Sequence, residues 1–154
     1  MSKAPDIHVK RWTSPERHPE IMAMIHAAFG GLTPPSGVLK ETVADFARRQ
    51  REGFVLVAMV DERFAGSMFC AVKDGALYLT RMATHPDWQK RGVGRALMAA
   101  AEQEARAMHL PKLLIRVRKN LPGNLAYFSK LGFAVTGEGA DPGRPPYDVM
   151  ERAL

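Results

Sequence analysis

A glycine-punctuated turn is the segment of this sequence best suited to chemistry. Gln89 opens it, the basic pair Lys90-Arg91 follows, and Gly92-Val93-Gly94 leads into a run with helical spacing of apolar residues. A helix N-terminus presents unpaired backbone N–H groups and a partial positive charge, and glycine lets an anion approach them closely. Arg95 adds a third positive charge at the same place. The turn therefore predicts a phosphate or pyrophosphate site.

Other phosphate-binding motifs fit this turn less well. A dinucleotide-binding turn requires G-x-G-x-x-G and a P-loop requires G-x-x-x-x-G-K-[ST], whereas only G-x-G is present here. A bare G-x-G is also typical of a connection selected for tight packing. On spacing alone, this structural alternative stays open.

The turn lies between a predicted strand and a predicted helix, in a chain that alternates the two. Strands are expected at 7–12, 54–60, 64–72, 76–84, 113–117, from 133 onward, and at 147–152. Helices are expected at 15–29, 39–51, 93–108 and 122–131. The order β-α-α-β-β-β-α-β-α-β-β predicts a single-domain α/β fold over 1–154. We expect a mixed sheet of about seven strands with helices on both faces.

Two of these helices carry informative details. Ser14 is expected to cap the first helix, with Pro15 at its first position. The helix at 93–108 has an inward stripe that is mostly alanine, so we expect it to approach its sheet closely. Strands 76–84 and 113–117 should be parallel, because the connection between them crosses over through this helix.

Two motifs resemble those of a known superfamily. Leu77-x-Leu79-x-x-Met82-Ala83-x-x-Pro86-x-x-Gln89-x-x-Gly92-x-Gly94-Arg95-Ala96-Leu97 resembles motif A of the GNAT N-acetyltransferases. Asn124-Leu125-Ala126-Tyr127-Phe128-Ser129-Lys130-Leu131-Gly132-Phe133 resembles motif B. The element order also matches that fold, so the resemblance spans the whole chain, and it is to bacterial enzymes acting on small-molecule or peptide amines.

The resemblance implies how a cofactor would bind. Strands 76–84 and 112–117 would splay apart, and acetyl-CoA would wedge between them, with its pyrophosphate on the backbone amides of 89–96. Asn124 would face the cofactor, although capping of its own helix is an equal alternative. The cofactor-binding residues implied are Met82, Ala83, Thr84, Gln89, Lys90, Arg91, Gly92, Val93, Gly94, Arg95, Ala96, Asn124 and Phe128.

The sequence departs from the family where a proton donor is expected. Phe128 stands where a tyrosine commonly reprotonates the departing thiolate. Tyr127 is adjacent, but one helical step of ~100° should point its hydroxyl elsewhere. The strand at 77–84 lacks the carboxylate that many relatives use as a base. The catalytic residues therefore stay unassigned; Tyr78, Thr80, His85 and Tyr127 are weak candidates for the proton donor, and His85 fits a loop residue better.

Composition limits the classes of protein. The 154 residues are 46% hydrophobic and 25% charged, as in a soluble globular domain, and one cysteine excludes a disulfide framework. No histidine pair has metal-ligand spacing, no apolar run could span a membrane, and no signal peptide is evident, so we expect a cytoplasmic protein without a metal. The net charge of +6 favours anionic partners, of which a CoA cofactor is one.

We therefore expect an acetyl-CoA-dependent N-acetyltransferase in which a primary amine attacks the thioester directly. A small molecule or a peptide would supply the amine, and a homodimer is compatible with the resemblance. The alternative is an acyl-CoA-binding sensor or interaction module with weakened catalysis. A nucleic-acid-binding protein is the least favoured hypothesis, because only the charge speaks for it.

Overall fold

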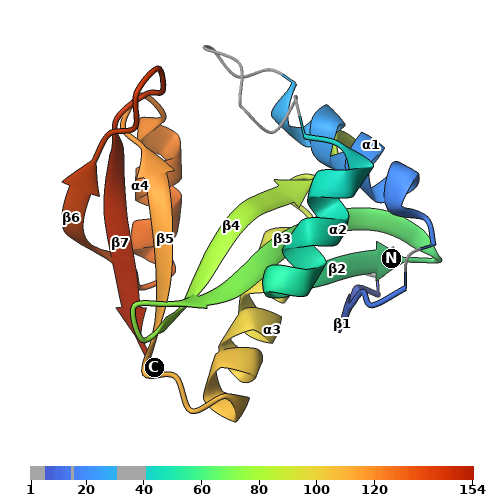
Figure 1. Ribbon diagram of the computed structural model, residues 1–154, viewed down its shortest axis with the longest axis horizontal. Helices are drawn as coiled ribbons and strands as arrows, with labels where there is room; N and C mark the ends of the chain where they lie inside the picture. Colours follow the sequence, from blue (N-terminus) through green and yellow to red (C-terminus); the bar gives the residue numbers. More distant parts are fainter. Residues whose placement is uncertain (1–5, 15, 31–40) are drawn as a thin grey trace, which may run out of the picture.

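The computed structural model describes residues 6–14, 16–30 and 41–154, and its strands form one seven-stranded sheet in the order β1-β2-β3-β4-β5-β7-β6 (Figure 1). The strands are β1 (His8–Arg11), β2 (Phe54–Val60), β3 (Arg63–Lys73), β4 (Ala76–Thr84), β5 (Lys112–Arg118), β6 (Ala134–Gly139) and β7 (Tyr147–Ala153). The helices are α1 (His18–Phe29), α2 (Val43–Glu52), α3 (Val93–Ala107) and α4 (Pro122–Lys130), with a short 3-10 helix, η2 (Pro86–Trp88).

The sheet is mixed, as predicted. Strands β1 to β4 pair antiparallel in sequence order, β4 and β5 are parallel, and β5, β7 and β6 pair antiparallel. Helix α3 makes the crossover between the two parallel strands, because antiparallel hairpin geometry is not available to them. The predicted α/β class and the element order are both confirmed.

Each face of the sheet has its own core. Val55 and Val57 of β2 pack with α1 and α2, whereas the alternate residues Leu56 and Ala58 pack with α3. Figure 1 shows α2 in front of the sheet, with α3 and α4 behind it. The inward stripe of α3 is buried at Val93, Leu97, Ala101 and Ala105, whereas Met108, at the C-cap, is 38% exposed.

A glycine on β3 sets how closely α3 approaches the sheet. A Cβ atom at Gly66 would lie 2.6 Å from Val93 Cγ1 and 2.7 Å from the carbonyl oxygen of Ala83. Neither contact is sterically acceptable, so only glycine allows α3 to begin where it does. The first residue of α3 is thereby fixed against β3 and β4.

The single cysteine belongs to the core. Cys70 is 2% exposed on β3, and burial raises the pKa of its thiol to about 12. Cys70 therefore packs as a small residue of the core.

The start of α1 differs from the prediction. The helix begins at His18, with Arg17 at the N-cap in a left-handed conformation (φ 62°), so Ser14 does not cap it. The Ser14 hydroxyl instead accepts a hydrogen bond from the Glu16 N–H (3.0 Å), and its carbonyl oxygen bonds the His18 ring (2.9 Å). These contacts form a turn before the helix. Pro15 lies outside the described residues.

Helix α2 is shorter than predicted at the start. It begins at Val43, capped by Thr42, and the residues from 39 to 40 lie outside the described part of the chain. Among the described helices, none is both long and apolar enough to cross a membrane.

Candidate active site

The two parallel strands separate almost as soon as they pair. Strand β4 pairs with β5 only at Leu77–Leu113 and Tyr78–Leu114. Strand β5 pairs with β7 along its whole length, and β4 with β3 along nearly all of its own. Figure 1 shows β4 and β5 diverging from this junction. The expected splay is confirmed, and within the described part of the chain no strand pairs with β4 beyond Tyr78 on that side.

A bulge bends β4 inside the splay. Ser67 of β3 faces Ala83 and Phe69 faces Thr80, so Arg81 and Met82 together oppose one residue of β3. Arg81 adopts a left-handed conformation (φ 54°) there. Such a bulge re-aims the backbone groups of a strand and increases its twist. The bulge therefore changes the direction of the β4 backbone groups within the splay.

A carboxylate from the start of α2 holds this bulge. Glu41 Oε1 accepts hydrogen bonds from Arg81 Nε (3.1 Å), Arg81 Nη2 (2.9 Å) and Arg49 Nη2 (2.7 Å). The Glu41 side chain is 12% exposed, and its other oxygen, Oε2, accepts no hydrogen bond from the described residues. The cluster was not anticipated, because 40 residues separate Glu41 from Arg81 and the bulge leaves no clear pattern in the sequence.

The turn before α3 is open at its helical end. Gly92 is the N-cap with φ 91°, a conformation that side chains disfavour. The first helical hydrogen bond runs from the Ala96 N–H to the Gly92 carbonyl oxygen (3.0 Å). The N–H groups of residues 92–95 therefore have no acceptor within the helix. Ala96 was expected to bind phosphate through its amide, and this hydrogen bond already occupies that group.

Positive charge surrounds these open N–H groups. Lys90, Arg91 and Arg95 are exposed, and no acidic residue lies in the first turn of α3. The Arg91 guanidinium lies over the Trp88 ring, 5.4 Å from its centroid. Oriented N–H groups, the helix dipole and three cations together make a site for an anion.

Tyr127 reaches this turn from α4. A Cβ atom at Gly94 would lie 2.8 Å from the Tyr127 hydroxyl oxygen, so the hydroxyl sits directly beside Gly94. The Tyr127 side chain thus spans from α4 to the first turn of α3. The sequence predicts that this hydroxyl points elsewhere than the proton-donor position held by Phe128, and in the structure it points toward the start of α3.

Motif B places its other residues differently from the prediction. Helix α4 begins at Pro122 with Leu121 at the N-cap, so Asn124 lies within the first turn and does not cap the helix. Asn124 is exposed. The Phe128 ring packs edge-on against Phe133, with 5.8 Å between centroids, and contributes to the α3-side core.

The remaining candidates divide between the site and the scaffold. Tyr78 lies at the last β4–β5 pair, and burial raises the pKa of its hydroxyl. His85 serves the scaffold, since its Nδ1 accepts a hydrogen bond from the Asp87 N–H (3.1 Å) at the start of η2. Met82 and Thr84 are half-buried, on the stretch of β4 beyond the junction.

These features define an α/β protein whose mixed sheet opens between two parallel strands, beside a helix start suited to binding an anion. The chain matches the acetyltransferase (GNAT) family over residues 18–133. It belongs to that family and is an acyltransferase.

Solved structures share the fold. The ribosomal-protein-S18-alanine N-acetyltransferase from Escherichia coli superposes with a TM-score of 0.78 at 19% identity, covering 96% of this chain and 94% of that one. The PaiA N-acetyltransferase from Thermoplasma acidophilum, in complex with coenzyme A, gives 0.80 at 14% identity, covering 97% and 99%. Ard1 from Thermoplasma volcanium gives 0.78 at 19% identity, covering 96% and 97%. None of the curated proteins matches the chain in sequence.

Proposed function

We propose that the protein is an acetyl-CoA-dependent N-acetyltransferase that transfers an acetyl group to a primary amine. The observation that carries the proposal is the splay of β4 and β5 beside the open N-terminus of α3. A long, narrow molecule with a polyanionic end fits both features at once. The coenzyme A complex of the Thermoplasma acidophilum relative, which has the same fold, supports this choice of donor.

The residues present fit the proposed donor. The N–H groups of residues 92–95 would receive the pyrophosphate, because Gly92 and Gly94 have no side chains to obstruct it. Lys90, Arg91 and Arg95 would neutralise its charge. The backbone of Met82 and Thr84 would hydrogen-bond the pantetheine arm, which would act as an extra strand on the open edge of β4. The donor would supply an activated acetyl group as a thioester.

The transfer we propose is a direct one. The lone pair of the neutral amine forms a C–N bond with the thioester carbonyl carbon, and the C–S bond breaks. The nitrogen gives up a proton and the sulfur departs as a thiolate, which then takes up a proton. Backbone N–H groups at the β4 bulge would stabilise the negative charge that develops on the carbonyl oxygen. No oxidant or metal is needed for this balance.

Proton transfer sets the demands on the site. An amine with a pKa near 10.4 is neutral in roughly one molecule in 2,500 at pH 7, which costs about 4.6 kcal/mol. Phe128 has no proton to give to the thiolate. A thiol with a pKa of about 8.5 is nevertheless a tolerable leaving group, and losing a general acid typically costs ~10²–10⁴ in rate rather than all activity.

Calorimetric titration with acetyl-CoA tests the donor, and release of free CoA with a panel of amines tests the reaction. We expect micromolar binding, which the double variant Arg91→Gln/Arg95→Gln weakens at least tenfold. The matched control is Arg106→Gln, which removes a charge from the far end of α3, where Arg106 pairs with Glu102. Equal affinity in all three proteins, or no release of CoA with any amine, would contradict the proposal.

A second candidate is an acyl-CoA-binding module with weakened catalysis. Its motivation is the Phe128 ring, which is packed against Phe133 at the position where a proton donor is commonly found. Phe128→Tyr distinguishes the two. An inert wild type that gains turnover from this substitution supports the second candidate, and robust wild-type turnover excludes it.

A further inference from the structure

A row of aromatic and cationic side chains crosses the sheet where β4 and β5 begin to separate, on the face that carries α1 and α2. Its centre is Arg116 of β5, two residues beyond Leu114, the last residue of β5 that pairs with β4. The Arg116 guanidinium lies 5.5 Å from the ring centroid of Tyr78 and 4.7 Å from that of Tyr147. Lys73 lies over the Tyr78 ring, 4.9 Å from the same centroid.

The face of this row follows from the alternation of β5. Leu113, Ile115 and Val117 pack into the core beneath α3. Arg116 points the opposite way, as residues alternate along a strand. The proposed phosphate contacts lie at the start of α3, on the other face. Arg116 is therefore separated from the proposed pyrophosphate site by the sheet, and an acceptor that approached the splay from this opposite face would meet its guanidinium.

The position of Arg116 is fixed before any ligand arrives. Two tyrosine rings flank its guanidinium, and stacking of this kind orients the planar group. Tyr147 is itself constrained by Gly139 on β6, since a Cβ atom there would lie 2.5 Å from the Tyr147 hydroxyl oxygen. Only a residue without a side chain permits this placement of Tyr147. Gly139 and Tyr147 together therefore help to hold the Arg116 guanidinium in place.

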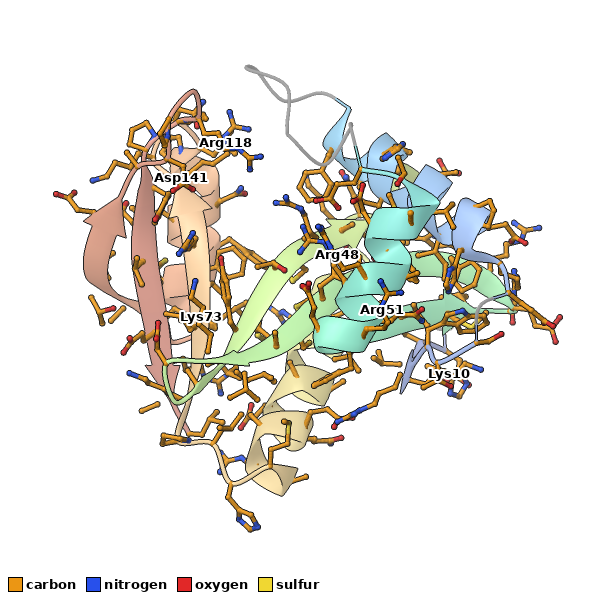
Figure 2. All side chains as sticks on the ribbon, in the orientation of Figure 1. Lys10, Arg48, Arg51, Lys73, Arg118 and Asp141 are labelled. Carbon is orange, nitrogen blue, oxygen red and sulfur yellow. The ribbon has the colours of Figure 1, made fainter. Side chains whose placement is uncertain are left out.

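The charge of Arg116 is poorly matched by its surroundings. Its Nη1 lies 4.0 Å from Asp141 Oδ2, a carboxylate whose side chain is 54% exposed, and it donates no hydrogen bond to any residue in the described ranges. Figure 2 shows Lys73 near the junction of the two strands and Asp141 above the opposite end of β5. An exposed ion pair of this length contributes little. The N–H donors of the Arg116 guanidinium are therefore open to a ligand.

A neighbouring arginine shows what a fully engaged guanidinium looks like in this protein. Arg81 donates two hydrogen bonds, of 3.1 Å and 2.9 Å, to the buried Glu41. Its charge is satisfied within the fold. Among the residues that the structure describes, no buried carboxylate pairs with Arg116 or Lys73, although both lie against the same tyrosine. Arg116 and Lys73 therefore place two cations, matched only by the exposed Asp141, on this face of the splay.

From this arrangement we infer that the acceptor is an amine that also bears a carboxylate, and that Arg116 binds the carboxylate through its two-pronged guanidinium. The inference rests on the proposed N-acetyltransferase function and names the class of its second substrate. A carboxylate matches the fork in geometry and charge. A diamine or polyamine would carry a second positive charge toward Arg116 and Lys73, which repel it, so such an acceptor is disfavoured.

Matched pairs of amines test this inference. The standard amino acids are compared with their carboxamides, and 1,4-diaminobutane serves as the dicationic probe, with CoA release measured at saturating acetyl-CoA. We expect at least one amino acid to exceed its carboxamide tenfold or more in kcat/KM. Arg116→Gln should remove that preference through a higher KM for the acid, with turnover of the carboxamide changed less than twofold.

Two further variants separate charge recognition from structural damage. Arg116→Lys keeps the charge without the fork and should restore part of the preference. Arg106→Gln removes a charge on the far end of α3 and should preserve the full preference. The inference is overturned when wild-type protein prefers no acid over its carboxamide, or when Arg116→Gln slows both members of a pair equally.

A binding measurement keeps this test independent of the proposed function. If no amine is acetylated in the first assay, the N-acetylated amino acids and the N-acetylated carboxamides are each titrated into protein saturated with CoA. Binding of an acid that exceeds its carboxamide tenfold and is lost in Arg116→Gln supports the carboxylate site, even though the transferase proposal has failed. Equal or absent binding of both overturns the inference as well.

Discussion

Helices α2 and α3 begin on opposite faces of the same sheet, and they treat their N-termini in opposite ways. In α2, the Thr42 hydroxyl accepts a hydrogen bond from the Asp45 N–H (3.3 Å), and Asp45 Oδ2 accepts one from the Thr42 N–H (2.8 Å). In α3, Gly92 provides no side-chain cap and the first turn contains no acidic residue. At the start of α2, side chains of the helix itself hydrogen-bond the backbone N–H groups. At the start of α3, the N–H groups stay open to a ligand.

The largest expected effect comes from giving α3 an acidic first turn like that of α2. Arg95→Glu places a carboxylate beside the open N–H groups, where it competes with a phosphate and repels it. We expect acetyl-CoA to bind about 100-fold more weakly, roughly 2.7 kcal/mol, with no loss of thermal stability. Calorimetry and thermal melting measure the two quantities.

The control for Arg95→Glu makes the same change in charge at the other end of the helix. Arg106→Glu should leave the affinity for acetyl-CoA within threefold of the wild type. A retained affinity in Arg95→Glu would show that the start of α3 is not the anion site, and the contrast between the two helices would lose its functional meaning.

The next effect concerns how α3 is held in place. Gly66→Ala forces a Cβ atom against Val93 and the Ala83 carbonyl, at 2.6 Å and 2.7 Å. Overpacking of this kind costs about 1–3 kcal/mol, and we expect the affinity for acetyl-CoA to fall as well, because the first turn of α3 must shift. Urea unfolding gives the stability; a variant as stable as the wild type would show that the close packing is not required.

A smaller effect is expected at α2. Thr42→Ala removes one half of its capping box and should lower the free energy of unfolding by about 1 kcal/mol. The affinity for acetyl-CoA should stay unchanged, because this cap faces no ligand. Urea denaturation and calorimetry on the same protein preparation test both statements. A loss of affinity without a loss of stability would reverse the roles assigned to the two helices.

The smallest effect is the dependence of the α2 cap on pH. Hydrogen bonds from the Thr42 backbone N–H and hydroxyl lower the pKa of Asp45, so the carboxylate stabilises the fold above its unfolded-state pKa. That contribution is lost as the pH falls through the folded-state pKa, which lies below the ordinary value of an aspartate. Asp45→Asn should therefore be less stable than the wild type at neutral pH, and the difference should shrink in acid. A constant difference from pH 7 to about pH 3 would contradict this.

The sequence predicted the fold and the turn before α3 because both rest on local patterns. Periodicity placed the strands and the alanine-rich face of α3, and glycine spacing with flanking cations located the open helix start. The start of α1 was missed for the opposite reason. Ser14 and Pro15 have the residue types of a cap, but Arg17 takes a left-handed conformation and delays the helix to His18.

The acceptor side of the site could not be predicted, since it depends on contacts between distant segments. Glu41 meets Arg81 only after a bulge has turned β4, and Arg116 meets Tyr147 only after β7 has paired with β5. Tyr127 shows the limit of reasoning from one helix alone. Its direction around α4 was foreseeable, but what lay in that direction depended on where α3 begins.

The buried Cys70 has a practical consequence for spectroscopy. With a pKa of about 12, roughly one Cys70 thiol in ten thousand is ionised at pH 8. Thiol reagents therefore do not react with it in the folded protein. A cysteine introduced on the exposed surface would then be the sole labelled position, with no need to remove the native one. A fluorophore attached there then reports from one known position on the protein.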